Sequence, residues 1–351
     1  MTKRSTTHVP AILISLVLAT AVFAGCGDDD DSTQSEPEAS ATTGSTQEVS
    51  LPEPITADGT RRVDLSDRLL TEISIPEGPD WTVYAFGSLW VKQDSGGVVR
   101  VDPETGKVIA RIAPGQSGGG HVCQGIGASE EAIWSCPPDD TVTRIDPATN
   151  SIAANVRIDK LPDQGRLVSA ADRIWVLTDS GERLSGIDTG TNKPATTVAL
   201  GGRCADLAAA GTTVWATCPL EDRVLRIDAG TGEVSDELEL AGATNAAVAD
   251  DLWVGFEGGL AQIDAKVLEV LAVYELSPRY GGSIFATSDT VWVREEGERF
   301  LSRIDPETQQ IVETIKAPEL PSGGDVVQIE GSVWATAFDD ATLVELKASG
   351  Q

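Results

Sequence analysis

The stretch VYAFGSLWVKQDSGGVVRVDPETGKVIARI at residues 83–112 contains the unit that repeats along most of this chain. It consists of an apolar segment, a turn, a Leu-Trp-Val strand, a polar loop, a strand that ends in Asp102, a turn and a last alternating strand. Short apolar runs of period two, separated by Gly, Asp and Ser, predict β-strands joined by tight turns. Each unit therefore predicts four short strands.

Two residues mark the copies of this unit. The tryptophan recurs at spacings of 44, 41, 40, 38, 39 and 42 residues, as Trp90, Trp134, Trp175, Trp215, Trp253, Trp292 and Trp334. The strand-ending aspartate follows 11 to 13 residues later, as Asp102, Asp146, Asp188, Asp228, Asp264 and Asp305. A period near 40 with four strands per copy is typical of a β-propeller blade. The sequence predicts an all-β, seven-bladed β-propeller over residues 61–351.

The last copy lacks a fourth strand, since the chain ends soon after TLVELKA at residues 342–348. Near the other end, RVDLSDRLLTEISIP at 62–76 follows RVDPETGKVIARIAP at 100–114 position by position. We therefore expect the strand around Leu70 to Ile75 to complete the last blade and close the ring, which would leave no open sheet edge there.

We expect the repeated residues to be structural. A tryptophan in each second strand would fill the wedge between neighbouring blades. Each aspartate would accept hydrogen bonds from the amides of the turn that follows it. Function needs one site and not seven.

The N-terminus indicates export. Lys3 and Arg4 precede an apolar run from Val9 to Phe23, which is typical of a signal peptide over residues 1–25. The small residues before Cys26 resemble the bacterial lipobox, which implies that Cys26 becomes the lipidated first residue. An ordinary secretory signal or an uncleaved anchor are the alternatives. The sequence thus predicts a lipid-anchored, extracytoplasmic protein of the cell envelope.

Residues 26–60 read as a disordered acidic tether. Between 27 and 60 there are nine acids, no Lys or Arg and few large apolar side chains, so this segment cannot bury enough surface to offset the entropy of ordering. A coil of this length would reach roughly 30 Å.

The remaining four cysteines also fit export. One cysteine lies 11 residues before a blade tryptophan and the other two or three after it, which places Cys123 opposite Cys136 and Cys204 opposite Cys218 across a hairpin. We predict two disulfides. The rival interpretation, a zinc site, lacks C-x-x-C spacing.

Charge restricts the partners. Asp and Glu number 55 against 26 Lys and Arg, a formal charge of −29, which excludes a nucleic-acid binder that must neutralise phosphates. With two histidines in the chain, mechanisms that need paired imidazoles are nearly excluded as well.

In a propeller, the loops that enter the first strands and the second-to-third strand loops open on one face around the channel. The first set supplies the candidate ligand-binding residues, which are Trp81, His121, Arg166, Arg203, Asn245, Arg279, Tyr280 and Asp325. The second set is an acidic rim of Asp94, Asp139, Asp140, Asp179, Glu182, Glu221, Asp222, Glu257, Glu295, Glu296, Glu298, Asp339 and Asp340. We expect Arg166 and Arg203 to meet Asp206, Asp325 or a ligand anion. The alternative is that these loops are polar because they are exposed.

The segment GSLWVKQDSGGVVRVDPETGKVIARI and its copies resemble the YVTN/YncE-like and streptogramin-lyase-like seven-bladed propellers of exported bacterial proteins. The resemblance implies that fold, and for the lyases a histidine acid/base with magnesium. This chain has no histidine after His121, so we expect a non-catalytic binding or protein-interaction module. The alternative is a metal-dependent lyase or hydrolase.

The expected partners are the membrane, through the lipid anchor, and an unknown small ligand or envelope protein, with no nucleic acid. We expect a monomer without a cofactor or a catalytic residue, although a divalent cation on the channel face is left open.

Overall fold

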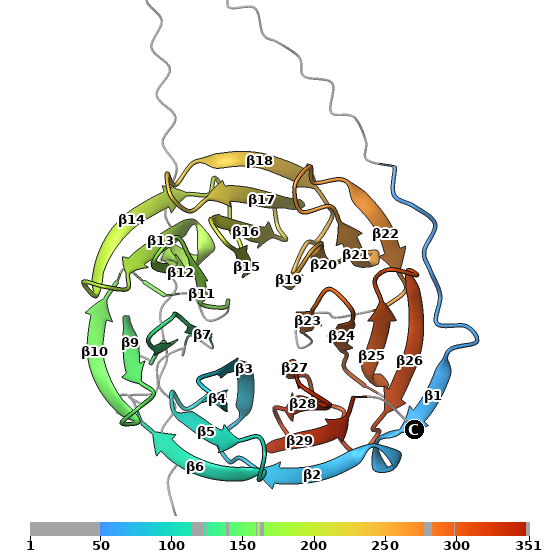
Figure 1. Cartoon of the computed structure of the whole chain (residues 1–351). Helices are drawn as coiled ribbons and strands as arrows, with labels where there is room; N and C mark the ends of the chain where they lie inside the picture. The colour runs from blue at the N-terminus through green and yellow to red at the C-terminus, as the bar shows by residue number, and fades with distance from the viewer. Residues whose placement is uncertain are drawn as a thin grey trace, which may run out of the picture. The chain divides into compact units, whose positions relative to one another are not determined.

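Each repeat forms an antiparallel sheet whose inner strands are apolar on both faces and whose outer strand alternates. In the first blade, strand β4 (Ser88–Gln93) is buried throughout, whereas the outermost strand β6 (Lys107–Ile112) alternates between exposed and half-buried side chains. The computed structural model describes residues 50–113, 123, 125–137, 140–158, 160–161, 165–276, 283–297 and 299–348. As predicted, the described residues form a propeller of seven blades in a ring (Figure 1).

Strands are numbered along the chain, and within each of blades 1 to 6 four successive strands run from the channel outward. Blade 1 comprises β3 (Pro79–Ala85), β4, β5 (Val98–Asp102) and β6. Blade 2 comprises β7 (Ile126–Ala128), β8 (Ile133–Ser135), β9 (Thr141–Asp146) and β10 (Ser151–Arg157). Blade 3 comprises β11 (Val168–Ala170), β12 (Arg173–Thr178), β13 (Arg183–Asp188) and β14 (Lys193–Ala199), and blade 4 comprises β15 (Asp206–Ala210), β16 (Thr213–Cys218), β17 (Arg223–Asp228) and β18 (Val234–Glu239).

Blade 5 comprises β19 (Ala246–Val248), β20 (Leu252–Phe256), β21 (Gly259–Ile263) and β22 (Val270–Tyr274). Blade 6 comprises β23 (Ile284–Ala286), β24 (Val291–Arg294), β25 (Arg299–Asp305) and β26 (Gln310–Lys316). Blade 7 comprises β27 (Val326–Ile329), β28 (Ser332–Ala337) and β29 (Thr342–Lys347), with β2 (Leu69–Ser74) as its outermost strand. Single 3₁₀ turns lie at Leu65–Asp67 and Asp179–Gly181.

The N-terminal strand closes the ring, as the sequence predicted. Strand β2 pairs antiparallel with β29, with Ile73 opposite Leu343. Before it, strand β1 (Arg61–Asp64) pairs in parallel with β26, so that blade 6 has five strands. Further upstream, the Ile55 amide donates to the Val273 carbonyl at 2.8 Å. Residues 55–74 therefore cover the outer edges of blades 5, 6 and 7 in succession.

The repeated aspartates cap the turns between third and fourth strands, also as predicted. The Oδ1 of Asp228 accepts from the amides of Gly230 and Thr231 at 2.8 Å each. Hydrogen bonds from the turn residues lower the pKa of the six equivalent carboxyls, those of Asp102, Asp146, Asp188, Asp228, Asp264 and Asp305.

The two predicted disulfides are present. Cys123 is bonded to Cys136 and Cys204 to Cys218, with Cα atoms 5.5 and 3.8 Å apart. Cys26, the signal peptide and residues 27–49 of the predicted tether lie outside the described residues, whereas residues 50–60 are described and Ile55 forms a parallel bridge with Tyr274. Within the described part of the chain, no helix has the length and apolar character needed to cross a membrane.

Candidate functional site

Four of the eight predicted ligand-binding residues, Trp81, Arg166, Asn245 and Asp325, occupy equivalent positions in their blades. In every blade, the blade tryptophan pairs with a residue of the innermost strand, as Trp90 does with Val83 and Trp334 does with Val327. The residue two positions earlier lies at the start of that strand. These seven equivalent residues, which we call the channel ring, are Trp81, Gly125, Arg166, Asp206, Asn245, Ser283 and Asp325.

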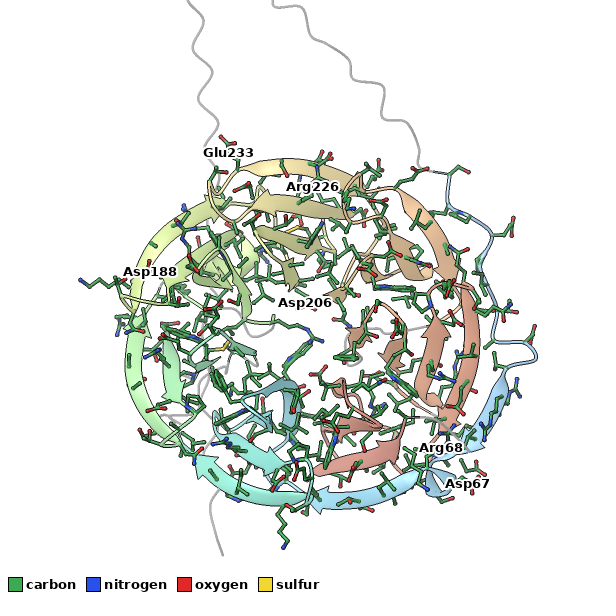
Figure 2. All side chains as sticks on the ribbon, viewed as in Figure 1. Asp67, Arg68, Asp188, Asp206, Arg226 and Glu233 are labelled. Carbon is green, nitrogen blue, oxygen red and sulfur yellow. A yellow bond between two sulfur atoms is a disulfide. The ribbon has the colours of Figure 1, made fainter. Side chains whose placement is uncertain are left out.

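Arg166 connects opposite sides of the channel ring. Its Nη2 lies 3.2 Å from Oδ1 of Asp325 and its Nε lies 3.6 Å from Oδ2 of Asp206. Its guanidinium carbon lies 4.1 Å from the centroid of the Trp81 ring. Figure 2 shows Asp206 at the inner end of blade 4, toward the channel. Arg166 thus meets both expected carboxylates and an aromatic face within the chain itself.

The two carboxylates also join neighbouring blades. Oδ2 of Asp325 accepts from the amide and the hydroxyl of Thr82 in blade 1, at 2.7 and 2.8 Å. Oδ2 of Asp206 accepts from the Ala246 amide in blade 5 at 3.1 Å. Burial raises the pKa of Asp206, an effect that Arg166 opposes. Both aspartates are almost fully buried, so their first role is structural.

Asp80, next to the channel ring, has a strongly raised pKa. Burial, together with the charges of Asp325 and Asp94, raises its pKa to about 7, while Lys92 and Arg166 act in the opposite direction. Lys92 is fully buried and donates to the Gln93 carbonyl at 2.9 Å, and burial lowers its pKa to about 8. A carboxyl that titrates near neutrality beside the channel is the group in this region best suited to proton transfer.

Of the other described candidates, Arg203 lies apart from Arg166, whereas Asn245 lies in the channel ring. Arg203 is 60% exposed and its Nε lies 3.6 Å from Oε1 of Glu182, within the acidic rim. Asn245 occupies the channel ring and is buried. Glu295, which we expected on the rim, is buried and accepts from the Ser302 hydroxyl at 2.6 Å. Three of the candidates, His121, Arg279 and Tyr280, and two of the rim acids, Asp139 and Glu298, lie outside the described residues.

A second recurring contact was missed at the sequence level. Opposite Trp90 on the third strand lies Arg100, whose guanidinium carbon is 4.6 Å from the ring centroid of that tryptophan. Its Nη1 donates to the Pro147 carbonyl and to Asn150 Oδ1 in the next blade, at 2.7 and 2.8 Å. We call this arrangement, a side chain beside the blade tryptophan that donates to the third-to-fourth strand turn of the next blade, the clasp.

The clasp recurs at three further blade contacts. Arg226 donates to the Lys266 carbonyl and Gln262 to the Pro306 carbonyl. In blade 3, where Gly186 lies opposite the tryptophan, Arg173 donates to Ala229 at 2.6 Å. A Cβ at Gly186 would approach Arg173 Cδ to 3.0 Å, so the glycine provides the space for this replacement.

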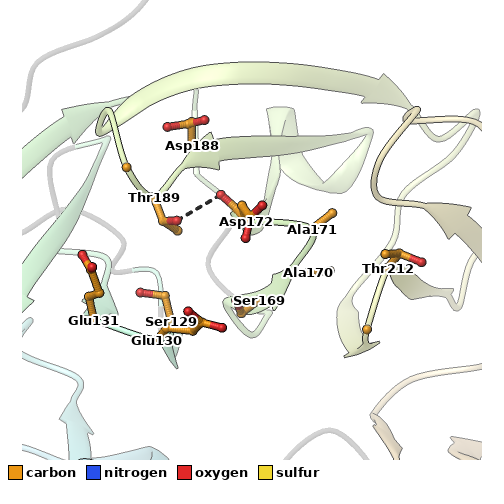
Figure 3. Close-up of a pocket in the computed structure, with 12 residues that line it drawn as sticks. Ser129, Glu130, Glu131, Ser169, Ala170, Ala171, Asp172, Asp188, Thr189 and Thr212 are labelled. Atoms are coloured by element: carbon orange, nitrogen blue, oxygen red, sulfur yellow. Dashed lines mark hydrogen bonds between the residues drawn. The ribbon is translucent and has the colours of Figure 1, made fainter.

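Two of the contacts without a clasp, those between blades 2 and 3 and between blades 7 and 1, contain cavities. We call the face with the first-to-second strand hairpins the hairpin face, and the opposite one, with the loops that enter the innermost strands, the inlet face. Between blades 2 and 3, Arg144 pairs with Glu131 of its own blade at 3.2 Å and does not reach blade 3. A cavity of about 690 Å³ lies there, lined by hairpins of blades 2, 3 and 4 and by Asp188, Thr189 and Gly190 (Figure 3).

A smaller cavity, of about 200 Å³, lies on the hairpin face between blades 7 and 1. There the residue opposite Trp334 is Glu345, and the turn of blade 1 begins at Asp102 and Pro103. A third cavity, of about 560 Å³, lies on the inlet face of blade 1 and is lined by Glu77, Gln93 and Arg111 among others. In the described parts of the chain, no group of three or more His, Cys, Asp or Glu is placed to hold a metal ion.

Comparison with known proteins identifies the fold alone. No family model matches the chain, and no curated protein matches it. The WD40 domain of Pan2 from Neurospora crassa is similar in structure, with a TM-score of 0.67 at 10% identity over 83% of this chain and 98% of that chain. Hydrazine synthase from Kuenenia stuttgartiensis gives a TM-score of 0.60 at 13% identity, over 80% and 99%. This chain has the β-propeller fold that these proteins share.

Proposed function

We propose that this protein is a lipid-anchored, extracytoplasmic β-propeller that acts without catalysis, as a monomeric binding module for a basic envelope protein. The observation that carries the proposal is that the arginine of the channel ring already has partners within the chain. Arg166 is already neutralised by Asp206 and Asp325 and covered by Trp81. An anionic ligand there would have to displace these internal partners.

The hairpin face supports binding better. It has the cavities between blades 2 and 3 and between blades 7 and 1. Glu130 and Glu131 are exposed at the larger cavity, and Tyr84 and Phe86 are 42% and 38% exposed on the hairpin of blade 1. Carboxylates around exposed aromatic side chains suit a basic protein surface, and the net charge of −29 would speed its encounter.

Lysines distinguish the two faces. Lys107, Lys193 and Lys266 are exposed at third-to-fourth strand turns on the hairpin face, whereas Lys160 is exposed on the inlet face. After amine-reactive cross-linking of intact cells, mass spectrometry of the purified full-length protein should find intermolecular cross-links at the first three. Cross-links confined to Lys160, or none at any lysine, would contradict the proposal.

The anchor is a separate part of the proposal. Metabolic labelling with a fatty-acid analogue should mark the wild-type chain and leave Cys26→Ala unlabelled. Equal labelling of both would overturn lipidation at Cys26.

The alternative, a metal-dependent lyase or hydrolase, predicts a bound ion. Our proposal predicts that protein purified natively without chelators contains much less than one equivalent of any divalent metal, as determined by elemental mass spectrometry. A stoichiometric metal whose removal abolishes an activity would favour the enzyme.

A further inference from the structure

The contact between blades 7 and 1 has the parts of a clasp except its cation. On one side is Trp334 and on the other the turn that begins at Asp102 and Pro103, and all three line the cavity. Pro103 follows the turn aspartate as Pro147 does in blade 2, where the carbonyl accepts from Arg100. Among the described residues that line the cavity there is no arginine, lysine or glutamine.

A carboxylate stands where other blades have the donor. Glu345 is paired with Trp334 in the sheet register, as Arg100 is with Trp90. Oε1 of Glu345 accepts from the Ser332 hydroxyl at 2.8 Å, and Ser332 also lines the cavity. Exposed Glu104 and Glu330 lie on opposite walls. The position that is cationic in blades 1, 2, 4 and 6 is therefore anionic here.

The size and the rim of the cavity point to an occupant from outside. The cavity, at about 200 Å³, is below the roughly 300–1,000 Å³ that small-molecule sites occupy, and its size suits one side chain. Tyr84, which is 42% exposed, forms part of its rim.

We infer that the cavity between blades 7 and 1 is a docking site for an arginine side chain of the partner protein. The incoming guanidinium supplies the missing cation of the clasp: it donates to the Pro103 carbonyl and pairs with the carboxylate of Glu345. A planar, multiply donating guanidinium meets a carbonyl and a carboxylate together better than the ammonium of a lysine. This inference rests on the proposed function and identifies the chemistry by which that function recognises its partner.

Glu345→Arg tests the site from within, because it supplies the cation from the chain itself. We expect the melting temperature to rise by about 2–4 °C, as one added contact would cause in a domain of this size. Glu233→Arg makes the same charge change at an exposed turn of blade 4 and should leave the melting temperature unchanged. An unchanged or lower value for Glu345→Arg would contradict the vacant clasp.

N-acetyl-argininamide tests binding with a defined probe. Millimolar concentrations should raise the melting temperature of the wild type and of Glu233→Arg, but not that of Glu345→Arg. N-acetyl-citrullinamide, which has the same shape without the charge, should have no effect. Equal shifts in all three proteins would overturn the site.

Cross-linking in cells separates this inference from the proposed function. Glu345→Arg should reduce the cross-linked partner by about tenfold. A wild-type yield from this variant would refute the arginine site and leave the binding function intact. If the wild type itself gives no cross-linked partner, the proposed function fails, whatever the small probe shows.

Discussion

Arg100 shows how a single residue joins two blades. Its guanidinium lies against Trp90 and donates to Pro147 and Asn150 of the next blade. A partly desolvated cation–π contact contributes about 1–2 kcal/mol, and each net hydrogen bond about 1 kcal/mol. Arg100→Ala should lower the free energy of unfolding by about 2–4 kcal/mol in urea denaturation. Exposed Arg157→Ala is the control, and an equal loss in both variants would show that the clasp is not stabilising.

Asp80 predicts an unusual pH dependence. Burial raises the pKa of Asp80 from 3.8 to about 7, so between pH 4 and pH 7 the folded chain holds a proton that the unfolded chain releases. The contribution of Asp80 to stability is therefore present at pH 4 and is lost as the pH rises through 7. Asp80→Asn removes this loss of stability at high pH, because an asparagine side chain does not ionise.

Relative to the wild type, the Asn variant should gain about 1–3 kcal/mol of unfolding free energy between pH 4 and pH 8, a figure reduced for the partial exposure of this side chain. Urea denaturation at a series of pH values measures the gain, with exposed Asp67→Asn as the control. A constant difference between Asp80→Asn and the wild type would refute the raised pKa.

The positions of the channel-ring residues could be predicted from their spacing to the blade tryptophans. The channel-ring residue lies nine positions before the blade tryptophan in six blades and eight positions before it in blade 5. That spacing identifies Trp81, Arg166, Asn245 and Asp325 as equivalent, and adds Asp206. The ion pair between Arg166 and Asp325 joins residues 159 positions apart, so no local pattern predicts it. Arg203 lies three residues before the channel-ring residue of blade 4, and its side chain is exposed beside Glu182 on the acidic rim.

The sequence contains a signal for the clasp. Arginine lies two residues before the turn aspartate in VRVD, TRID, LRID and SRID, at 99–102, 143–146, 225–228 and 302–305. Period-two alternation places that arginine on the tryptophan side of the strand. Whether it reaches the next blade depends on the neighbouring turn, as the different bonding of Arg144 shows.

At the scale of elements, the seven blades were predictable because the strand pattern around the blade tryptophan recurs seven times in the sequence. Closure by β2 was predictable because its sequence repeats that of β6. The position of strand β1 was not predictable. Its sequence Arg-Val-Asp matches the end of the third strand of blade 1, but in blade 7 the third strand is β29, and β1 pairs with β26 of blade 6. Parallel addition to an outer edge has no turn signal, because it depends on where the ring brings the chain.

Truncations measure what each N-terminal element contributes. Removal of residues 27–49 should not change the melting temperature. Removal of 27–64 should lower it by several degrees, because β1 and the buried Val63 are lost. Removal of 27–76 should unfold the domain, because β29 loses its partner strand and Ile75 is fully buried. If the last two truncations melt together by circular dichroism, the ring is not closed by β2.

At the scale of the whole molecule, the two faces differ in what remains available. The inlet face directs its charges inward, through Arg166 and its two aspartates. The hairpin face retains cavities at two contacts that lack a clasp. We therefore expect the partner to bind on the hairpin face.

The most direct test compares two matched charge reversals in the full-length protein. Glu130→Lys/Glu131→Lys alters the hairpin face, and Glu182→Lys/Glu257→Lys alters the inlet face. In each pair all side chains are exposed, and one carboxylate pairs with an arginine, Arg144 or Arg203. The measurement is the yield of the cross-linked partner from intact cells. We predict a loss of at least tenfold for the first pair and a wild-type yield for the second, whereas a loss confined to the inlet-face pair would contradict the account.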